Sequence, residues 1–211
     1  MNNYLEDYIK NPSRIEERSF EIILDELGEH NFDEREIQIV RRVIHTTADF
    51  EYANLIDIHK DAIDIAIKAF SEGSNIYADT NMVVSGTNKR KLKELGVEIY
   101  CLVHDEEVFK IAKERGITRS MAGIEKAMKD EKTKIYAIGN APTAIFRMLE
   151  LIEEGMPKPD LVIGVPVGFV GAEESKEALR KSGIPYIVIR GRKGGSPVAA
   201  TILNAIMYQI D

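Results

Sequence analysis

Residues 134–145 read KIYAIGNAPTAI, and this stretch contains the unit from which the fold is built. The apolar run at 134–138 indicates a buried strand. Gly139 and Asn140 follow it as a turn, and Pro142 stands where a helix begins, because proline is favoured in the first helical turn. A strand, a tight turn and a helix start make up the βα unit of parallel sheets.

The same succession of apolar run, turn and amphipathic stretch repeats from about residue 74 to the end of the chain. Such alternation is typical of repeated βα units. The runs that predict strands are Asn75–Ala78, Val97–Val103, Lys134–Ile138, Asp160–Val165 and Pro185–Ile189. With helices between them, these runs predict an α/β protein with a five-stranded parallel sheet covered on both faces, in three layers, α/β/α.

Helices are predicted ahead of these units. Asn11 and Pro12 start a helix whose apolar residues recur at helical spacing up to Gly28, and Asp33 with Glu36 opens a second helix. No linker is visible along the chain. The predicted organisation is a single domain over 1–211, with helices over about 1–72 and βα repeats over about 73–211.

The composition is that of an ordered, acidic chain. Of its 211 residues, 44% are hydrophobic and 30% are charged, and the formal net charge is -7. Because nucleic-acid binding needs a basic excess, none is expected, and an anionic ligand must meet a local basic cluster. No apolar stretch is long enough to span a bilayer, and a lone Cys101 cannot form an intrachain disulfide. We expect a soluble, cytoplasmic protein without a membrane partner.

Glycines and small polar residues crowd the positions that follow the predicted strands. The segments concerned are Asp79–Gly86, Gly139–Thr143, Val165–Ala172 and Arg190–Pro197. Because parallel sheets bind ligands beyond the carboxyl ends of their strands, the loops predict a site on one rim, with backbone N–H groups facing anionic groups. Taken singly, each loop is more simply explained by ordinary turn chemistry. The spacing matches neither GxGxxG nor GxxxxGK[ST], and no zinc signature exists, so neither a nucleotide nor a metal site is predicted.

Two side chains have unusual positions on their predicted helices. His45 lies at the border of an apolar helix side, where a group that titrates near neutral pH can be half buried and half presented. It is equally compatible with a histidine that hydrogen-bonds a backbone carbonyl. Arg119 lies in the first turn of a helix, where a cation is unfavourable unless an anion faces it. That position favours a ligand carboxylate, although pairing with a nearby glutamate also explains it.

Several segments, taken together, resemble the precorrin-8X/cobalt-precorrin-8 methylmutase family. They are ERSFEII at 17–23, RVIH at 42–45, YADTNMV at 77–83, TRS at 118–120, IGNAPTA at 138–144, GVPVGFVGAEESK at 164–176 and RGRKGGS at 190–196. The similarity extends over nearly the whole chain, and its two longest blocks, at 138–144 and 164–176, are specific.

This resemblance implies a flavodoxin-like fold and a homodimer whose sites are built from both subunits. It implies an isomerase that moves a methyl group from ring carbon 11 to ring carbon 12 of precorrin-8 or cobalt-precorrin-8, giving hydrogenobyrinate or cobyrinate. It implies no separate cofactor, because cobalt, where present, arrives within the substrate. The family's essential histidine falls on His45, and its binding arginine and serine fall on Arg119 and Ser19.

One segment departs from part of the family. In the cobalt-free, aerobic members the histidine is followed by Ala-Cys-Gly, whereas here it is followed by Thr46–Phe50. The segment favours the anaerobic branch, in which the substrate contains cobalt.

The implied chemistry assigns roles to the rim. Methyl migration around a conjugated ring needs neither a nucleophile nor a redox partner, so we expect His45, as imidazolium, to donate a proton or hydrogen bond near the migrating methyl. The side chains expected to bind substrate carboxylates are Arg119, Arg190, Arg192 and Lys193. Those expected against the flat ring, with core packing as the alternative, are Met82, Val83, Phe169 and Val170. The remaining predicted substrate contacts are Asp79, Thr80, Asn140, Gly194 and Ser196.

Two other functions stay open at this point. A non-catalytic corrinoid carrier of the same fold would bind without turnover, but the presence of His45 argues against it. A nucleotide-dependent transferase would use the glycine loops, but the missing phosphate motifs disfavour it.

Overall fold

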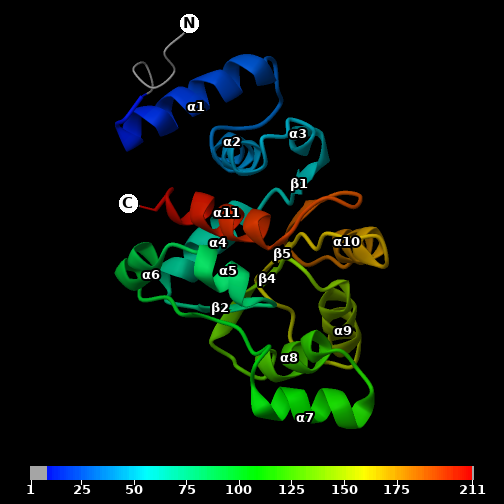
Figure 1. The fold of residues 1–211 in the computed structure, drawn as a ribbon. Coiled ribbons are helices and arrows are strands. Elements are labelled where there is room, and N and C mark those ends of the chain that lie inside the picture. Colours follow the sequence, from blue (N-terminus) through cyan, green and yellow to red (C-terminus); the bar gives the residue numbers. More distant parts are fainter. Residues whose placement is uncertain (1–8, 211) are drawn as a thin grey trace, which may run out of the picture.

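The centre of the protein is a six-stranded sheet with the strand order β1-β6-β5-β4-β2-β3 (Figure 1). The computed structural model describes residues 9–210, so residues 1–8 and 211 of the predicted domain lie outside the described part. The strands are β1 Ile56–Ile58, β2 Asn75–Ala78, β3 Ile99–Tyr100, β4 Thr133–Ile138, β5 Leu161–Gly164 and β6 Tyr186–Ile189.

The five predicted strands are confirmed and pair in parallel, from β3 through β2, β4 and β5 to β6. The prediction of five strands was nevertheless wrong by one, because β1 joins β6 as an antiparallel edge strand, with Ile56 opposite Ile189. Residues 1–72 are therefore not all helical. β1 has only three residues, too few to show the alternation of apolar and polar residues by which a strand is predicted. It is a strand because its backbone pairs with that of β6.

Both faces of the central parallel strands β2, β4 and β5 are buried, as their almost continuous apolar sequence requires, whereas the edge strand β3 is partly buried. On β2, Ile76 belongs to one hydrophobic cluster and Tyr77 to the other, and Ile135 and Tyr136 alternate in the same way on β4. This two-residue alternation divides the core into one half on each face of the sheet.

Helices cover each half of the core (Figure 1). The helices that contribute to the first half are α4 Ala62–Ser71, α5 Asn81–Gly86, α6 Lys89–Leu95 and α11 Ser196–Met207, with α1 Pro12–Leu27, α2 Glu36–Thr47 and α3 Tyr52–Leu55 outside them. Those on the other side are α7 Glu106–Arg115, α8 Arg119–Ala127, α9 Pro142–Glu153 and α10 Ala172–Lys181. No helix within residues 9–210 is long and apolar enough to cross a membrane.

The predicted N-terminal helices are confirmed, and their ends are capped by the residues that signalled them. The Asn11 side chain accepts a hydrogen bond of 3.1 Å from the Arg14 N–H at the start of α1, and Gly28 ends that helix at φ 64°. Before α2, the Asp33 carboxylate accepts from the Glu36 N–H at 2.8 Å, while the Glu36 carboxylate accepts from the Asp33 N–H at 3.1 Å. This reciprocal pair satisfies donors that the first helical turn leaves free.

Candidate functional site at the carboxyl ends of the strands

Asp79, directly after β2, joins two strands at the rim. Its side chain accepts hydrogen bonds from the backbone N–H groups of Gly139 at 2.9 Å, Asn140 at 2.8 Å and Ala141 at 2.7 Å. Burial raises the pKa of Asp79, while these N–H donors act in the opposite direction. Asp79, which is 3% exposed, therefore holds the β4–α9 turn in place through these hydrogen bonds, and a contact with substrate stays a prediction.

Thr80 and Ser196 join the rim to α11. Their hydroxyl groups lie 2.8 Å apart, and Thr80 also caps α5 by accepting from the Val83 N–H at 3.3 Å. Gly139 packs against this contact so closely that a Cβ atom there would lie 2.7 Å from the Ser196 Cα atom. The predicted rim residues of three loops are therefore in mutual contact.

A cavity of about 540 Å³ opens at the ends of β2, β3 and β4. It brings together four predicted site residues, Asp79, Thr80, Arg119 and Asn140. Its other lining residues are Asn81, Val103, His104, Thr118, Ser120, Ala141, Pro142 and Thr143.

Arg119 is the cation of this cavity that forms no ion pair within residues 9–210. Its guanidinium donates a hydrogen bond of 3.2 Å to the Val103 carbonyl, and its side chain is exposed. The alternative of a pairing with glutamate is therefore not what the structure contains. Because a carbonyl neutralises no charge, the guanidinium stays available to a ligand carboxylate.

Helix starts add to the positive potential here. Thr118 caps α8 by accepting from the Met121 N–H at 3.2 Å, and its hydroxyl lies 3.0 Å from that of Thr143, in the first turn of α9. Two helix N-termini thus open into the cavity, where their free N–H groups favour an anion.

Sequence reasoning missed several residues of this cavity. His104 follows β3 and is exposed, so it reaches the rim from the strand next to β2. A histidine placed directly after the apolar run 97–103 was the available signal. The pairing of Thr118 with Thr143 had no signal, because it joins two helix starts 25 residues apart.

The loops after β5 and β6 form a second part of the rim, with apolar side chains turned outward. Phe169 is 83% exposed, Val170 90% and Met82, on α5, 61%. The Arg192 guanidinium lies over the Phe169 ring, 5.5 Å from its centre. Core packing is therefore excluded for these three apolar residues. Val83, by contrast, packs in the core, because its side chain is fully buried and cannot face a ligand.

Close backbone contacts hold these two loops together. The Gly195 N–H donates to the Val165 carbonyl at 2.8 Å, and the Gly168 N–H donates to the Arg192 carbonyl at 3.1 Å. At Gly194, φ is 144° and a Cβ atom would lie 2.2 Å from the Val165 oxygen. Gly194 is therefore required by packing between the loops.

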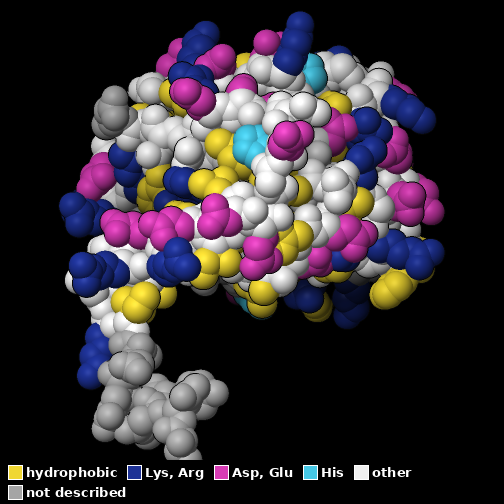
Figure 2. All heavy atoms as spheres, turned by 90° about the horizontal axis from the view of Figure 1, so that it is seen from above, with side chains coloured by type: hydrophobic (Ala, Val, Ile, Leu, Met, Phe, Trp, Pro, Cys, Tyr) yellow, Lys and Arg dark blue, Asp and Glu magenta, His cyan; other side chains and the backbone are white. Residues whose placement is uncertain are grey.

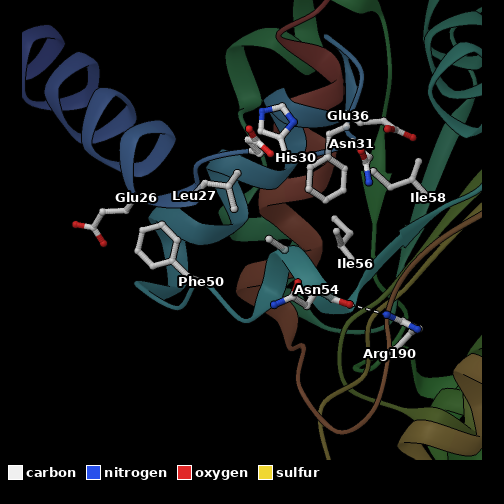
Figure 3. A pocket seen from close by; sticks show the side chains of 13 residues that line it. Glu26, Leu27, His30, Asn31, Glu36, Phe50, Asn54, Ile56, Ile58 and Arg190 are labelled. Carbon is white, nitrogen blue, oxygen red and sulfur yellow. Dashed lines mark hydrogen bonds between the residues drawn. The ribbon is translucent and has the colours of Figure 1, made fainter.

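Two predicted carboxylate-binding cations are used within the protein. The Lys193 ammonium forms ion pairs with Asp49 and Glu51, which raise the pKa of Lys193. The Arg190 guanidinium donates at 2.5 Å to the Asn54 carbonyl and lines a different cavity, of about 700 Å³, together with glutamates of the α1–α2 region (Figure 3). Neither side chain lines the cavity of Arg119, and binding of substrate carboxylates by these two cations stays a prediction.

His45 lies in the outer helical layer, on α2. Its exposed ring contacts the Phe20 ring edge-to-face with centres 5.5 Å apart, and within the described chain it makes no hydrogen bond to a backbone carbonyl. Ser19 precedes Phe20 on α1 and donates to the Ile15 carbonyl at 2.7 Å. The His45 ring lines a hollow of about 170 Å³, whose other lining residues are Arg42, Thr46, Thr201, Asn204 and Tyr208. This hollow is separate from the cavity of Arg119.

A family model described as precorrin-8X methylmutase matches residues 14–209 of the chain. The chain belongs to this family. The match includes both parts of the rim and the α2 residue His45. The family match thus includes His45 in the outer helical layer as well as the rim of the sheet.

Individual relatives agree with this assignment. The cobalt-precorrin-8 methylmutase of Priestia megaterium is 48% identical, over 95% of this chain and 89% of the relative. The precorrin-8X methylmutase of Sinorhizobium sp. is 38% identical, over 95% of this chain and 96% of the relative. A solved precorrin-8X methylmutase from Thermus thermophilus superposes with a TM-score of 0.86 at 37% identity, covering 94% of this chain and 98% of that one.

Replacing Asp79 tests its role in the rim. We expect Asp79→Asn to lower the free energy of unfolding by about 3 kcal/mol, because an amide nitrogen then faces an N–H donor and a charged acceptor is lost. Urea denaturation measures the change. Asp64→Asn is the control, since that carboxylate is 75% exposed and its removal should change stability by about 0.5 kcal/mol or less. Equal effects of the two substitutions would contradict the assigned role.

Two glycines of one loop separate backbone conformation from close packing. Gly191 has φ 71° and nothing within 4 Å of a Cβ position, so Gly191→Ala should cost about 1 kcal/mol. Gly194→Ala adds a collision with the Val165 carbonyl and should cost about 3 kcal/mol or more. Thermal unfolding compares the two variants. A smaller loss of Tm for Gly194→Ala than for Gly191→Ala would show that the loops are not packed as described.

Proposed function

We propose that this chain is an isomerase of corrin-ring biosynthesis that moves a methyl group from ring carbon 11 to ring carbon 12 of cobalt-precorrin-8 or precorrin-8. The product is cobyrinate or hydrogenobyrinate. Two relatives that each match 95% of this chain are named as methylmutases of cobalt-precorrin-8 and of precorrin-8X. The observation that best supports a catalytic role is the exposed ring of His45, which forms no hydrogen bond within residues 9–210 and is accessible to a ligand.

The reaction makes modest chemical demands on the protein. One carbon–carbon bond to the methyl breaks and another forms, while the π electrons of the macrocycle rearrange, so that no atom or electron is gained or lost. The protein must therefore select a pose and a tautomer. His45, as imidazolium, donates a proton or hydrogen bond to the macrocycle near the migrating methyl and draws electron density from the conjugated system. No separate cofactor takes part, and cobalt, where present, belongs to the substrate.

The acidic side chains of the substrate are bound where the protein is locally positive. Arg119 and the N-termini of α8 and α9 bind carboxylates at the cavity of the parallel strands. Arg192 provides a second cation, held over the exposed Phe169 ring, and the neighbouring Val170 and Met82 offer apolar contact to the flat ring. An acidic protein can therefore bind an acidic ligand.

The active form is a homodimer with sites shared between subunits. Within one chain His45 and Arg119 line separate hollows, so a partner that brings a second copy of each hollow can complete the site. The α1 helix also exposes Ile15, Ile22 and Leu24, at 44%, 41% and 37%. Figure 2 shows the face on the side of α1 and α2, where charges of both signs are mixed and hydrophobic side chains lie between them. Such a mixed surface suits contact with a second protein chain.

The cobalt-containing substrate is favoured by the segment after His45. Thr46 shares a hydrogen bond of 2.9 Å with Thr201 on α11, and Asp49 pairs with Lys193. The first contact places Thr46 in the wall of the hollow that His45 lines, and the second ties the end of the segment to the β6–α11 loop. A small Ala-Cys-Gly segment could form neither contact. The relative named for the cobalt substrate is also the more similar of the two described above.

The order of the five parallel strands supports the flavodoxin-like description of the fold. Numbered among themselves along the chain, they lie in the order 2-1-3-4-5, with β1 added at one edge. The point where the order reverses lies between β2 and β4, beside the cavity of Arg119.

A cytoplasmic location stays a prediction.

The visible absorption spectrum of the substrate tests the reaction directly. Wild-type protein incubated with cobalt-precorrin-8 should give the cobyrinate chromophore, and His45→Ala should lower kcat by about 100-fold or more, the usual contribution of a positioned acid. His30→Ala, an exposed histidine at the 700 Å³ cavity, should retain activity. Parallel incubation with cobalt-free precorrin-8 measures the metal preference. Binding without conversion under any condition would leave the carrier function in place of the enzyme.

Mixing two inactive variants tests the shared site. If His45 and Arg119 of one site come from different subunits, a dimer of His45→Ala with Arg119→Ala contains one intact site. Random exchange should then restore about a quarter of wild-type activity, because half of the dimers are mixed. Differently tagged chains and native mass measurement verify that mixed dimers form. Mixed dimers without activity would contradict the proposed sharing between these two residues.

A further inference from the structure

Lys176 is a buried cation that the proposed reaction does not use. It lies on α10, is 0% exposed, and donates a hydrogen bond of 2.9 Å to the Lys193 carbonyl. Within the described residues it forms no ion pair, and Glu173, one turn earlier, is the carboxylate whose charge acts on it. Burial lowers the pKa of Lys176 to about 8. The side chain is thus a charge in the interior with a single neutral acceptor.

Such a group weakens the fold at neutral pH. The unfolded chain keeps this proton up to the ordinary value of 10.5, whereas the folded chain loses it near 8. The penalty is therefore largest below pH 8 and shrinks as the pH rises from 8 towards 10.5. An apolar side chain of similar length would avoid it. Lys176 therefore does not serve stability at neutral pH, and its hydrogen bond to the Lys193 carbonyl indicates another role.

The contact lies between the two loops that carry Phe169 and Arg192. Lys193, whose carbonyl binds Lys176, directly follows Arg192, and the Arg192 carbonyl accepts from the Gly168 N–H, next to Phe169. The Gly195 N–H completes the connection by donating to Val165. The ammonium group thus anchors the β6–α11 loop from below, at the residue beside the exposed guanidinium.

The other charged groups nearby leave this role to Lys176. The β5–α10 loop, residues 165–171, contains no ionisable side chain. The β6–α11 loop contributes three cations. The Arg190 guanidinium donates to the Asn54 carbonyl, Arg192 lies over Phe169, and the Lys193 ammonium group turns to Asp49 and Glu51. Lys176 is therefore the positive charge beneath these two loops.

We propose that Lys176 is a positioning residue for substrate binding, which fixes the 190–195 loop against the 165–171 loop so that Arg192 and Phe169 form one preorganised surface for the anionic macrocycle. The proposal rests on the proposed function for the identity of the ligand. The arrangement of the loops themselves does not depend on it. Preorganisation raises affinity because the loops lose less conformational entropy when the ligand binds.

The test compares Lys176→Met and Lys176→Gln with wild type and with Lys181→Met, an exposed lysine of the same helix. Without substrate, hydrogen exchange at the Gly168 and Gly195 amides should be about tenfold faster in Lys176→Met. With cobalt-precorrin-8, KM should rise about tenfold or more while kcat changes little, the range expected for loss of one charged hydrogen bond. Lys176→Gln keeps a donor and should lie between the two, and Lys181→Met should match wild type.

The pH profile separates positioning from plain stabilisation. The KM of the wild type should rise above about pH 8, where Lys176 loses its proton, and Lys176→Met should lack that step. Unchanged exchange and unchanged KM in Lys176→Met would overturn the proposal, as would a fall in Tm with no change in either quantity. Because the exchange measurement needs no substrate, its result stands even if the wild type fails to convert cobalt-precorrin-8, which would contradict only the proposed function.

Discussion

The rim of the sheet depends on one carboxylate, that of Asp79. Three consecutive backbone N–H groups, from Gly139 to Ala141, point at its two oxygens, so the end of β2 and the turn after β4 cannot move independently. A buried carboxylate with charged hydrogen bonds tolerates little displacement, because each lost bond leaves a buried polar group unpaired. The start of α9, the contact of Gly139 with α11 and the cavity of Arg119 all follow from this position.

The cations of this acidic protein divide into two groups with different uses. Lys193 and Arg190 are bound to acceptors of the protein and stabilise the loops around the rim. Arg119 and Arg192 have a carbonyl and an aromatic ring as neighbours, which leave their charges available. Arg119 and Arg192 therefore keep positive charge where a ligand can reach it, and a net charge of -7 is compatible with an anionic substrate.

The two parts of the proposed site lie in different layers, and α11 sets their relation. Its first residue, Ser196, contacts Thr80 at the rim, and Thr201 contacts Thr46 beside His45. Five residues along a helix span about 7.5 Å. Because α11 is almost completely buried between the sheet and α2, this relation is rigid, so movement of the outer layer would have to disturb the core. A partner subunit that meets both layers would therefore find both in fixed positions.

The sequence alone determined the parallel strands, the helix caps and the position of the rim, because these depend on local periodicity and on residues such as Asn11, Gly28 and Pro142. It also indicated Arg119 and His45. Only the tertiary structure decided which rim side chains are bound within the protein. Asp79, Lys193 and Arg190 each have a partner that is distant in sequence, whereas Arg119 forms no ion pair within residues 9–210. It likewise decided that β1 is a strand and Val83 is core. The physical reason is that pairing and burial are properties of contacts between elements, which no local pattern encodes.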